Sequence, residues 1–266
     1  MVILIAGASG GFGSVLGRTL VDSGMAVYGT CRNPDAISEG DFAFPMLKLE
    51  ATDTASIAQC IDFVLEREGR IDVLINCVNQ MIIGAVEEQT VDEVKTLYDA
   101  NVFGVISICQ QVIPAMKKQG AGTIVNMSSL GGLLAVPYMS AYTSAKFALE
   151  AFSEALYHEL KPAGIDVVIM QPVAMAMDRP AEGSHLRKVA NVGPDSPSHR
   201  MMERMAKDTA ASKLTPEMVA RHVLRIITQE RKPLRVPLDR AKALGLIKRF
   251  APQSVIDRLI GGLLRS

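Results

Sequence analysis

The stretch "VILIAGASGGFGSVLG", residues 2–17, carries the strongest indication of the fold. Its first five residues are apolar and rich in β-branching, which predicts a buried strand. Gly7, Gly11 and Gly13 follow with the spacing G-x-x-x-G-x-G and lead into an apolar segment of helical period. Glycines at such a turn let backbone N–H groups approach a pyrophosphate at a helix N-terminus. Because glycines also form ordinary turns, this motif alone does not establish a nucleotide site.

Short apolar runs alternate with longer helix-period segments along the rest of the chain. Strands are predicted at residues 2–6, 26–30, 46–49, 72–76, 122–127, 165–170 and 234–238. Helices are predicted at 11–24, 53–69, 92–118 with an interruption at Pro114, 140–161 and 215–229, before an amphipathic tail. Most of these strands are apolar almost throughout, which suits burial on both faces of a parallel sheet. The sequence therefore predicts an α/β protein with a Rossmann-type doubly wound parallel sheet flanked by helices, in a single domain over residues 1–266.

Composition narrows the classes of function. Hydrophobic residues make up 48% and charged residues 21% of the chain, enough for a sizeable core. Acidic and basic residues balance at 28 each, which gives no reason to expect a nucleic-acid partner. No segment offers the roughly 18 uninterrupted apolar residues that a membrane span needs. The four scattered cysteines, without a C-x-x-C pair or a histidine cluster, predict reduced thiols in a cytoplasmic protein and no metal site: Cys31, Cys60, Cys77 and Cys109.

The amino-acid composition changes between residues 173 and 213. Gly-, Pro- and Ser-rich polar sequence is mixed there with methionines, and so long an irregular segment predicts a substrate lid. The methionines fit either simple packing or a flexible apolar surface over a bulky substrate: Met175, Met177, Met201, Met202 and Met205. The tail "SVIDRLIGGLLRS", residues 254–266, carries an apolar stripe. Packing on the core or on a partner subunit fits this stripe better than light contact with a membrane surface, which stays open.

A second stretch, "SAYTSAKFALEAF" at residues 140–152, places Tyr142 and Lys146 four residues apart on a predicted helix. Residues at this spacing share a helix face, so both side chains can reach one site. An ammonium beside a phenol favours the phenolate, and lowering the tyrosine pKa by ~3 units corresponds to roughly 4 kcal/mol. Ser128 and Ser129 follow the strand at 122–127, at the sheet edge where α/β proteins bind ligands.

The end of the second strand, "YGTCRNP", bears on cofactor choice. Sites selective for NAD usually place an acidic residue there to accept from the ribose 2′-hydroxyl, and this stretch has none. Arg32 instead suits the 2′-phosphate of NADP, although a surface arginine after a strand would look the same. The candidate cofactor contacts in these two turns are Gly7, Ser9, Gly11, Phe12, Gly13, Arg32 and Asn33.

Taken in order, the motifs resemble one family. The glycine turn, N-x-x-G at Asn101, Ser129 thirteen residues before the tyrosine, and Y-x-x-x-K from Tyr142 to Lys146 occur as in short-chain dehydrogenases/reductases of the single-domain type. The resemblance covers about residues 2–172, and parts of it are similar to the hydroxysteroid and retinol dehydrogenase branch. No single motif is specific, but the ordered set is.

The resemblance implies a role for each matching residue. Tyr142 would be the general acid in reduction or the base in oxidation, and Lys146 would lower its pKa and bind the nicotinamide ribose. Ser129 rather than Ser128 would hydrogen-bond the substrate oxygen. Asn101 would position a water that links Lys146 to solvent. These roles agree with the chemistry expected of the residue types.

The chain also departs from the family pattern in three loops that flank the cofactor. The usual N-N-A-G after the fourth strand is replaced by Asn76-Cys77-Val78-Asn79. Glu50-Ala51 replaces D-V, and Pro172-Val173 replaces P-G. The resemblance still places these residues at the cofactor, with altered contacts to adenine and nicotinamide. Cys77 could be redox-sensitive or simply packed.

The sequence thus predicts an NADP(H)-dependent oxidoreductase that interconverts a ketone or aldehyde and an alcohol. The favoured substrate is a bulky hydrophobic carbonyl compound, steroid-, retinoid- or polyketide-like. A catalytically weak NADP(H)-binding sensor on the same fold is the alternative, kept open by the altered Asn76–Asn79 loop. A sugar-nucleotide isomerase or dehydratase fits the glycine spacing and the short C-terminal part less well. The resemblance also implies a homodimer or homotetramer through the helices at 92–118 and 140–161.

Overall fold

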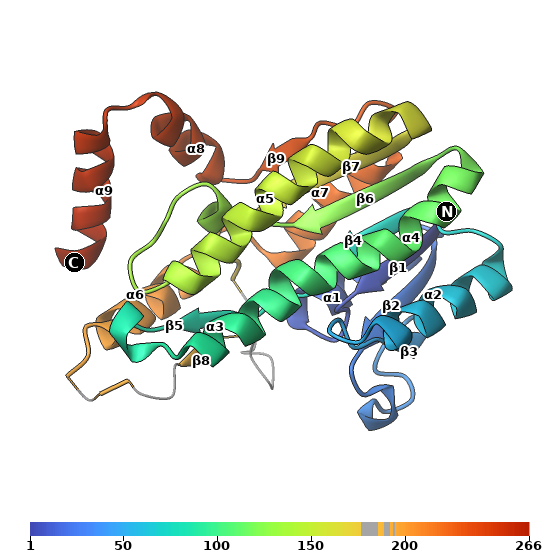
Figure 1. Ribbon diagram of the computed structural model, residues 1–266, viewed down its shortest axis with the longest axis horizontal. Coiled ribbons are helices and arrows are strands. Elements are labelled where there is room, and N and C mark those ends of the chain that lie inside the picture. The colour runs from blue at the N-terminus through green and yellow to red at the C-terminus, as the bar shows by residue number, and fades with distance from the viewer. Residues whose placement is uncertain (177–185, 189–191, 194, 266) are drawn as a thin grey trace.

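The seven predicted strands pair into one sheet in the computed structural model, which describes residues 1–176, 186–188, 192–193 and 195–265 (Figure 1). The strand order is β3-β2-β1-β4-β6-β7-β9, and every neighbouring pair is parallel. The strands are β1 (Val2–Ala6), β2 (Ala26–Cys31), β3 (Met46–Lys48), β4 (Val73–Asn76), β6 (Gly122–Met127), β7 (Ile165–Gln171) and β9 (Arg235–Pro237). Each lies within two residues of its predicted bounds, so the predicted fold class is confirmed.

The strand order reverses direction between β1 and β4. From β1 the chain builds outward through β2 and β3, and from β4 it builds the other way through β6, β7 and β9. In doubly wound sheets, ligands bind at the carboxyl ends of the strands beside such a reversal. The glycine turn after β1 and the loop after β4 meet at this point.

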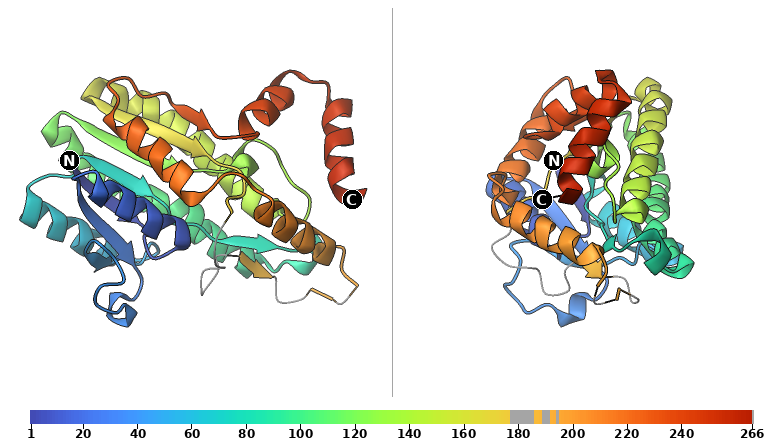
Figure 2. Two further views of the ribbon diagram at one scale, coloured as in Figure 1. Left: turned by 180° about the vertical axis from the view of Figure 1, so that it is seen from behind. Right: turned by 90° about the vertical axis from the view of Figure 1, so that its left-hand side faces the viewer.

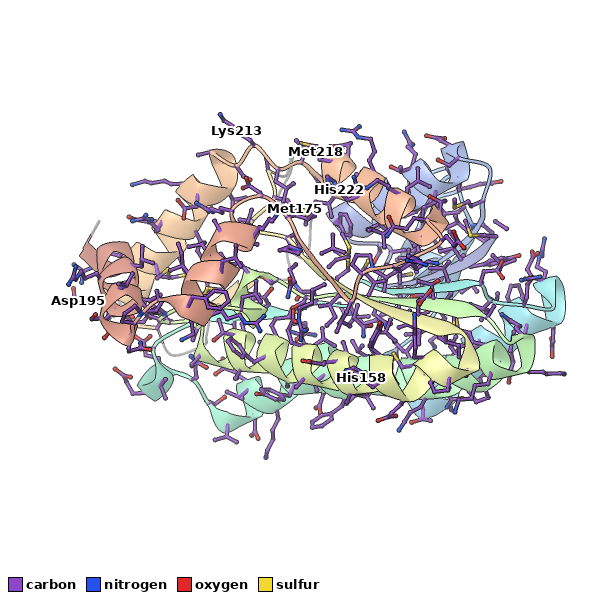
Figure 3. The ribbon with its side chains drawn as sticks, turned by 90° about the horizontal axis from the view of Figure 1, so that it is seen from above. His158, Met175, Asp195, Lys213, Met218 and His222 are labelled. Atoms are coloured by element: carbon purple, nitrogen blue, oxygen red, sulfur yellow. The ribbon has the colours of Figure 1, made fainter. Side chains whose placement is uncertain are left out.

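Helices cover both faces of the sheet, so the fold has three layers: helices, sheet and helices. Apolar side chains of α2, α4 and α5 form one buried cluster with the sheet, and those of α1 and α7 form a second cluster on its other face. Figure 2 shows α1 and α7 from behind, and Figure 3 places His158 of α5 and His222 of α7 on opposite sides of the sheet. The helices are α1 (Gly11–Asp22), α2 (Thr54–Glu68), α4 (Val105–Gln119), α5 (Ser140–Leu160) and α7 (Pro216–Thr228).

The prediction for residues 92–118 was wrong about the interruption. The helix breaks not at Pro114 but at a π-helical turn, Asp99–Gly104, between α3 (Val91–Tyr98) and α4. Pro114 lies on the exposed side of α4. The carbonyl of Gln110, which loses its helical partner there, is also on the exposed side and can bond to water.

The described part of the segment at 173–213 contains regular elements that the irregular sequence did not predict. These are β8 (Leu186–Lys188), parallel to β5 (Met81–Ile83), and the helix α6 (Ser198–Ala210). Ser198 fixes the start of α6: its hydroxyl accepts from the backbone N–H of Ala85 at 2.9 Å and donates to Glu88 at 2.8 Å. Residues 177–185, 189–191 and 194 of the predicted lid, with Met177, lie outside the described residues.

The chain ends in two helices, α8 (Ala241–Phe250) and α9 (Gln253–Arg265), separated near Pro252. Figures 1 and 2 show them extending away from the sheet and its covering helices. Of the helices described, none combines the length and apolarity needed to cross a bilayer. The four cysteines are free thiols.

Candidate active site

The glycine turn packs tightly against the loop after β4. Gly7 has φ +83°, and a Cβ placed on it would lie 2.9 Å from the backbone nitrogen of Val78. A Cβ on Gly13 would lie 2.7 Å from the carbonyl oxygen of Gly7. These contacts leave no room for side chains, so the backbone itself forms the surface of the turn.

The N-terminus of α1 suits an anion. Gly10 is its N-cap and contributes no side-chain cap, and the first turn has no acidic residue. The first N–H groups of a helix lack intrahelical partners and carry the positive end of the helix dipole. Ser9 is exposed beside them and Phe12 is half-buried. The residues present therefore fit a pyrophosphate at this turn.

Arg32 and Asn33 are both exposed directly after β2. Within the described part of the chain, Arg32 has no carboxylate within ion-pair distance. Its guanidinium is thus available to a ligand phosphate. After β3, in contrast, the carboxylate of Glu50 already accepts from the Thr52 hydroxyl at 3.0 Å, so an adenine amino group would compete with Thr52 for it.

Asn76, Cys77 and Val78 connect the turn to the core. Asn76 donates to the Asn126 side chain at 2.8 Å, and the backbone N–H of Cys77 donates to the Ala6 carbonyl at 2.8 Å. Burial raises the pKa of the Cys77 thiol to about 12. A thiol with this pKa is protonated at neutral pH, which favours the packed interpretation of Cys77 over the redox-sensitive one.

The predicted triad of side chains converges at the carboxyl end of β6. Tyr142 and Lys146, on one face of α5, are 7% and 1% exposed, and the Lys146 nitrogen lies 5.7 Å from the centre of the Tyr142 ring. The side chain of Ser129 interacts with Tyr142. The Ser129 oxygen accepts the N–H of Gly131 at 3.1 Å, which leaves its O–H to donate to a substrate or to Tyr142.

Ser128 and Ser129 have different surroundings. The Ser128 hydroxyl is buried and has no hydrogen-bond partner among the described residues. It lies 2.6 Å from where a Cβ on Gly132 would be, a point that is also 3.2 Å from a Glu150 carboxylate oxygen. The structure therefore brings Ser129, not Ser128, to Tyr142.

Burial is the largest influence on the pKa values of Tyr142 and Lys146. The pKa of Tyr142 is raised by burial, an effect that the Ser129 side chain opposes. The Lys146 ammonium donates to the Met127 carbonyl at 2.9 Å. The predicted lowering of the Tyr142 pKa, which depends on Lys146 together with an oxidised nicotinamide ring, stays a prediction. Burial lowers the pKa of Lys146 to about 8, against upward contributions from Cys77 and Glu150. At neutral pH the phenol is therefore protonated.

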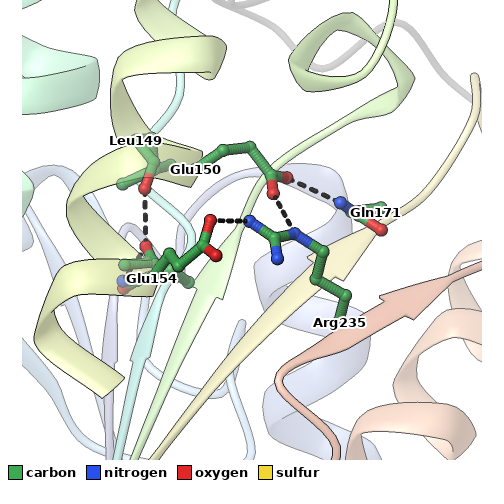
Figure 4. A network of polar contacts seen from close by, with 7 residues as sticks. Leu149, Glu150, Glu154, Gln171 and Arg235 are labelled. Carbon is green, nitrogen blue, oxygen red and sulfur yellow. Dashed lines mark hydrogen bonds and ion pairs between the residues drawn. The ribbon is translucent and has the colours of Figure 1, made fainter. Parts of the chain in front are cut away.

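Glu150, four residues beyond Lys146, belongs to a partly buried polar network that was not predicted from the sequence (Figure 4). Its carboxylate accepts from Gln171 at 2.9 Å and from the Nε of Arg235 at 3.0 Å, and it is 5% exposed as a residue. Arg235 also bonds Glu154 at 2.7 Å. Because Cys77 is a neutral thiol where Lys146 titrates, Glu150 is the anion that supports the Lys146 charge. The four-residue spacing from Lys146 to Glu150 on one helix could have indicated this pairing from the sequence.

Asn101 lies in the π-helical turn and is fully buried. Its Oδ1 accepts from the backbone N–H of Gln80, and its Nδ2 donates to the backbone carbonyl of Gln80, both at 2.6 Å. The side chain therefore holds the loop after β4, and its predicted link through water to Lys146 stays a prediction. On the other side of the site, Pro172 accepts from the N–H of Leu130 at 2.9 Å, and Val173 is buried.

An apolar cluster surrounds Tyr142. Met139, Ala141 and Met201 are buried in it, and Met202 and Met205 of α6 pack against it half-exposed. Met175, in contrast, packs with the cluster of α1 and α7 (Figure 3). The α6 methionines thus lie on the same side as Tyr142, as a hydrophobic substrate surface would require.

A separate groove of about 520 Å³ lies at the amino ends of the strands, lined among others by Val2, Gly122 and Asp166. It is at the opposite edge of the sheet from Tyr142, and its charged residues already pair: Arg70 with Asp72, and Lys232 with Asp166. The groove therefore plays no part in the candidate site.

A parallel doubly wound sheet with a phosphate-type glycine turn and a Ser-Tyr-Lys set at its carboxyl edge defines a Rossmann-fold oxidoreductase. The chain belongs to the short-chain dehydrogenase/reductase family, since the family model described as short chain dehydrogenase matches residues 1–184.

One related protein and two solved structures illustrate the similarity. The 3-ketodihydrosphingosine reductase of Bacteroides thetaiotaomicron is 42% identical over 64% of this chain, and the chain spans 62% of that protein's length. A short-chain dehydrogenase structure from Streptomyces avermitilis is 30% identical with a TM-score of 0.84, covering 98% of each chain. A short chain dehydrogenase from Burkholderia cenocepacia, solved in complex with NADP, shares the fold at 21% identity, with a TM-score of 0.76 and 97% of each chain covered.

Proposed function

We propose that the protein is an NADP(H)-dependent reductase of hydrophobic ketones or aldehydes. The observation that carries this proposal is the convergence of Ser129 and Lys146 on Tyr142 at the carboxyl end of β6. Tyr142 supplies the proton, and Ser129 donates a hydrogen bond to the carbonyl oxygen of the substrate. The O–H proton of Tyr142, whose pKa is raised by burial, is present at neutral pH and can be donated to the carbonyl oxygen during reduction.

Lys146, held by the groups around it, orients Tyr142, the proton donor. Its ammonium is held by the Met127 carbonyl and supported electrostatically by Glu150. A cation beneath the phenol stabilises the phenolate that forms when the proton leaves. The buried cluster around Tyr142 limits water access to the reacting carbonyl.

NADP(H) fits the residues at the β1 and β2 turns. Gly7 and Gly13 would face the pyrophosphate with the N-terminus of α1, and Arg32 would bind the 2′-phosphate. When bound, the nicotinamide supplies hydride to the substrate carbon. The preference for NADP over NAD rests on Arg32 and on the lack of a carboxylate in "YGTCRNP".

The apolar cluster around Tyr142 and one relative support the proposed substrate class. Met201, Met202 and Met205 offer flexible apolar side chains near Tyr142. The similarity to a 3-ketodihydrosphingosine reductase makes that long-chain ketone the first substrate to test. Steroid-, retinoid- and polyketide-like ketones follow it.

A homo-oligomer through α4 and α5 is part of the proposal. Phe103 and Phe147 are 58% and 41% exposed in the π-helical turn and α5, as side chains at a subunit interface would be in a single chain. Sedimentation velocity of the protein would show a dimer or tetramer, and a monomer at micromolar concentration would contradict the proposal. The cytoplasmic location predicted from the cysteines stays a prediction.

The experiment that tests the function compares the wild type with Tyr142→Phe. NADPH oxidation at 340 nm is followed with a panel of hydrophobic ketones, and NADPH binding is titrated in parallel. We expect turnover with at least one ketone and a fall in kcat of about 10²–10⁴-fold in the variant, with NADPH affinity kept. Tight NADPH binding without turnover by either protein would support the sensor alternative instead.

A further inference from the structure

The last two helices expose apolar side chains that the rest of the described chain does not cover. We define the C-terminal arm as the described side chains of residues 241–262. Ala241 is buried in the cluster formed with α1 and α7 and attaches the arm to the body, and Ile256 of α9 is also buried. In contrast, Leu246 and Phe250 of α8 are 53% and 73% exposed. In α9, Val255 is 37% and Leu259 is 41% exposed, and these four residues are called the apolar stripe.

The spacing shows that the exposure is organised. Leu246 and Phe250 are four residues apart, as are Val255 and Leu259, so each pair shares one face of its helix. Ala241 lies on the opposite side of α8 from Phe250 and is fully buried. The first helix of the arm therefore has one side buried in the protein and one apolar side directed outward.

Basic residues border this stripe. Lys242 and Arg249 lie four residues before and three after Leu246, and the Arg249 guanidinium lies 5.4 Å from the centre of the Phe250 ring. Arg258 neighbours Leu259 in α9. The arm holds four basic residues and one acidic residue, Asp257, whereas the whole chain balances at 28 of each sign.

We propose that the C-terminal arm docks on an anionic lipid surface, with the apolar stripe entering the headgroup region and the basic side chains contacting lipid phosphates. A short helix with an apolar face, flanking Lys and Arg and low overall hydrophobicity is the pattern of an interfacial helix. Each basic residue near such a surface adds attraction that salt screens. A second copy of the arm suits the stripe less well, because a self-complementary contact would bring borders of the same positive charge together.

The arrangement would bring the body of the enzyme close to a membrane that stores hydrophobic ketones. The docking does not depend on catalysis, since the arm contains no residue of the Ser129, Tyr142 and Lys146 site. Binding can therefore be measured without cofactor or substrate, and a failure of docking is distinguishable from a failure of the proposed activity.

The test is co-flotation of the full chain with vesicles of phosphatidylcholine alone or mixed with phosphatidylglycerol, at low and high salt. The double variant Leu246→Asp/Phe250→Asp removes the stripe of α8, and Lys242→Glu/Arg249→Glu reverses its border. Phe63→Asp, at a phenylalanine of α2 that is 44% exposed, is the matched control. Circular dichroism checks that each variant is folded.

We expect the wild type and Phe63→Asp to float with the anionic vesicles and to be released by high salt. Both arm variants should bind about tenfold or more weakly, a difference of roughly 1.4 kcal/mol. Absence of flotation, or equal flotation of all variants, would overturn the proposal. An oligomer that dissociates in the stripe variant without any lipid binding would assign the arm to a contact between copies.

Discussion

Asn101 and the backbone of Gln80 form a reciprocal pair of hydrogen bonds, both 2.6 Å long. One side chain thereby satisfies both the N–H and the carbonyl of a residue 21 positions earlier. The contact joins the π-helical turn before α4 to the loop after β4. This loop also packs against the glycine turn through Val78. The position of Asn101 therefore affects the wall of the proposed cofactor site without requiring direct contact with a cofactor.

Replacing Asn101 with Ala should destabilise the protein by about 2–4 kcal/mol, because two hydrogen bonds are lost and the Gln80 backbone groups lose their partner. Asn101→Asp should be at least as harmful, since a carboxylate cannot donate to the Gln80 carbonyl. Urea unfolding followed by circular dichroism measures both. The control Ser144→Ala changes an exposed hydroxyl of α5 and should cost under about 0.5 kcal/mol. If Asn101→Ala is as stable as this control, the two hydrogen bonds between Asn101 and Gln80 do not stabilise the fold.

The sheet could be predicted from sequence because its signals are local. The apolar runs 2–6 and 122–127 match β1 and β6 residue for residue. Asp53 and Gly69 cap α2 as their residue types indicate: Asp53 accepts from Ala55 at 2.9 Å, and Gly69 has φ +72°. Tyr142 and Lys146 converge because four-residue spacing on a helix fixes their common face.

The remaining features depend on contacts between distant segments. The π-helical turn follows from Asn101 holding Gln80 and from Gly104 packing on Ala51, where a Cβ would lie 2.8 Å from the Ala51 carbonyl oxygen. Glu150 and Arg235 are 85 residues apart in sequence. The direction of the Tyr142 pKa shift depends on its burial by such segments, and sequence spacing alone indicated the opposite direction.

Arg32→Ala should lower kcat/KM with NADPH about 10–100-fold, because it removes charge-assisted hydrogen bonds to the 2′-phosphate. With NADH, which lacks that phosphate, the change should stay within about threefold. Initial rates with both cofactors and one ketone measure the ratio. The matched control is Arg18→Ala. Arg18 is an exposed arginine of α1, and its replacement should leave kcat/KM with NADPH and with NADH unchanged. Equal losses with NADPH and NADH would show that Arg32 does not recognise the phosphate.

Glu150→Gln should move the alkaline limb of the pH profile of kcat/KM to lower pH by about 0.5–1 unit. Burial lowers the pKa of Lys146 to about 8 while Glu150 acts to raise it, so removing the Glu150 charge lets the ammonium deprotonate at lower pH. The matched control is Glu154→Gln, which removes the other carboxylate bonded to Arg235 but is not among the groups that shift the pKa of Lys146.

A shift of the limb in Glu150→Gln but not in Glu154→Gln would identify Glu150 as a positioning residue for Lys146. A purely structural role would lower the free energy of unfolding in both variants and leave the limb in place. Thermal melts of the two variants separate these outcomes, because they report stability independently of the pH profile.

Gly7→Ala and Gly24→Ala separate backbone strain from the close approach in the glycine turn. Both glycines have positive φ, +83° and +78°, so either substitution should cost about 1 kcal/mol of conformational strain. Only at Gly7 would the new Cβ also meet the Val78 nitrogen at 2.9 Å, whereas nothing lies within 4 Å at Gly24. Urea unfolding should therefore show a larger loss for Gly7→Ala, about 2–4 kcal/mol in total, and NADPH titration should show weakened binding for that variant alone. Equal destabilisation and unchanged NADPH affinity in both variants would show that the turn tolerates a side chain and that its glycines are not needed for the cofactor.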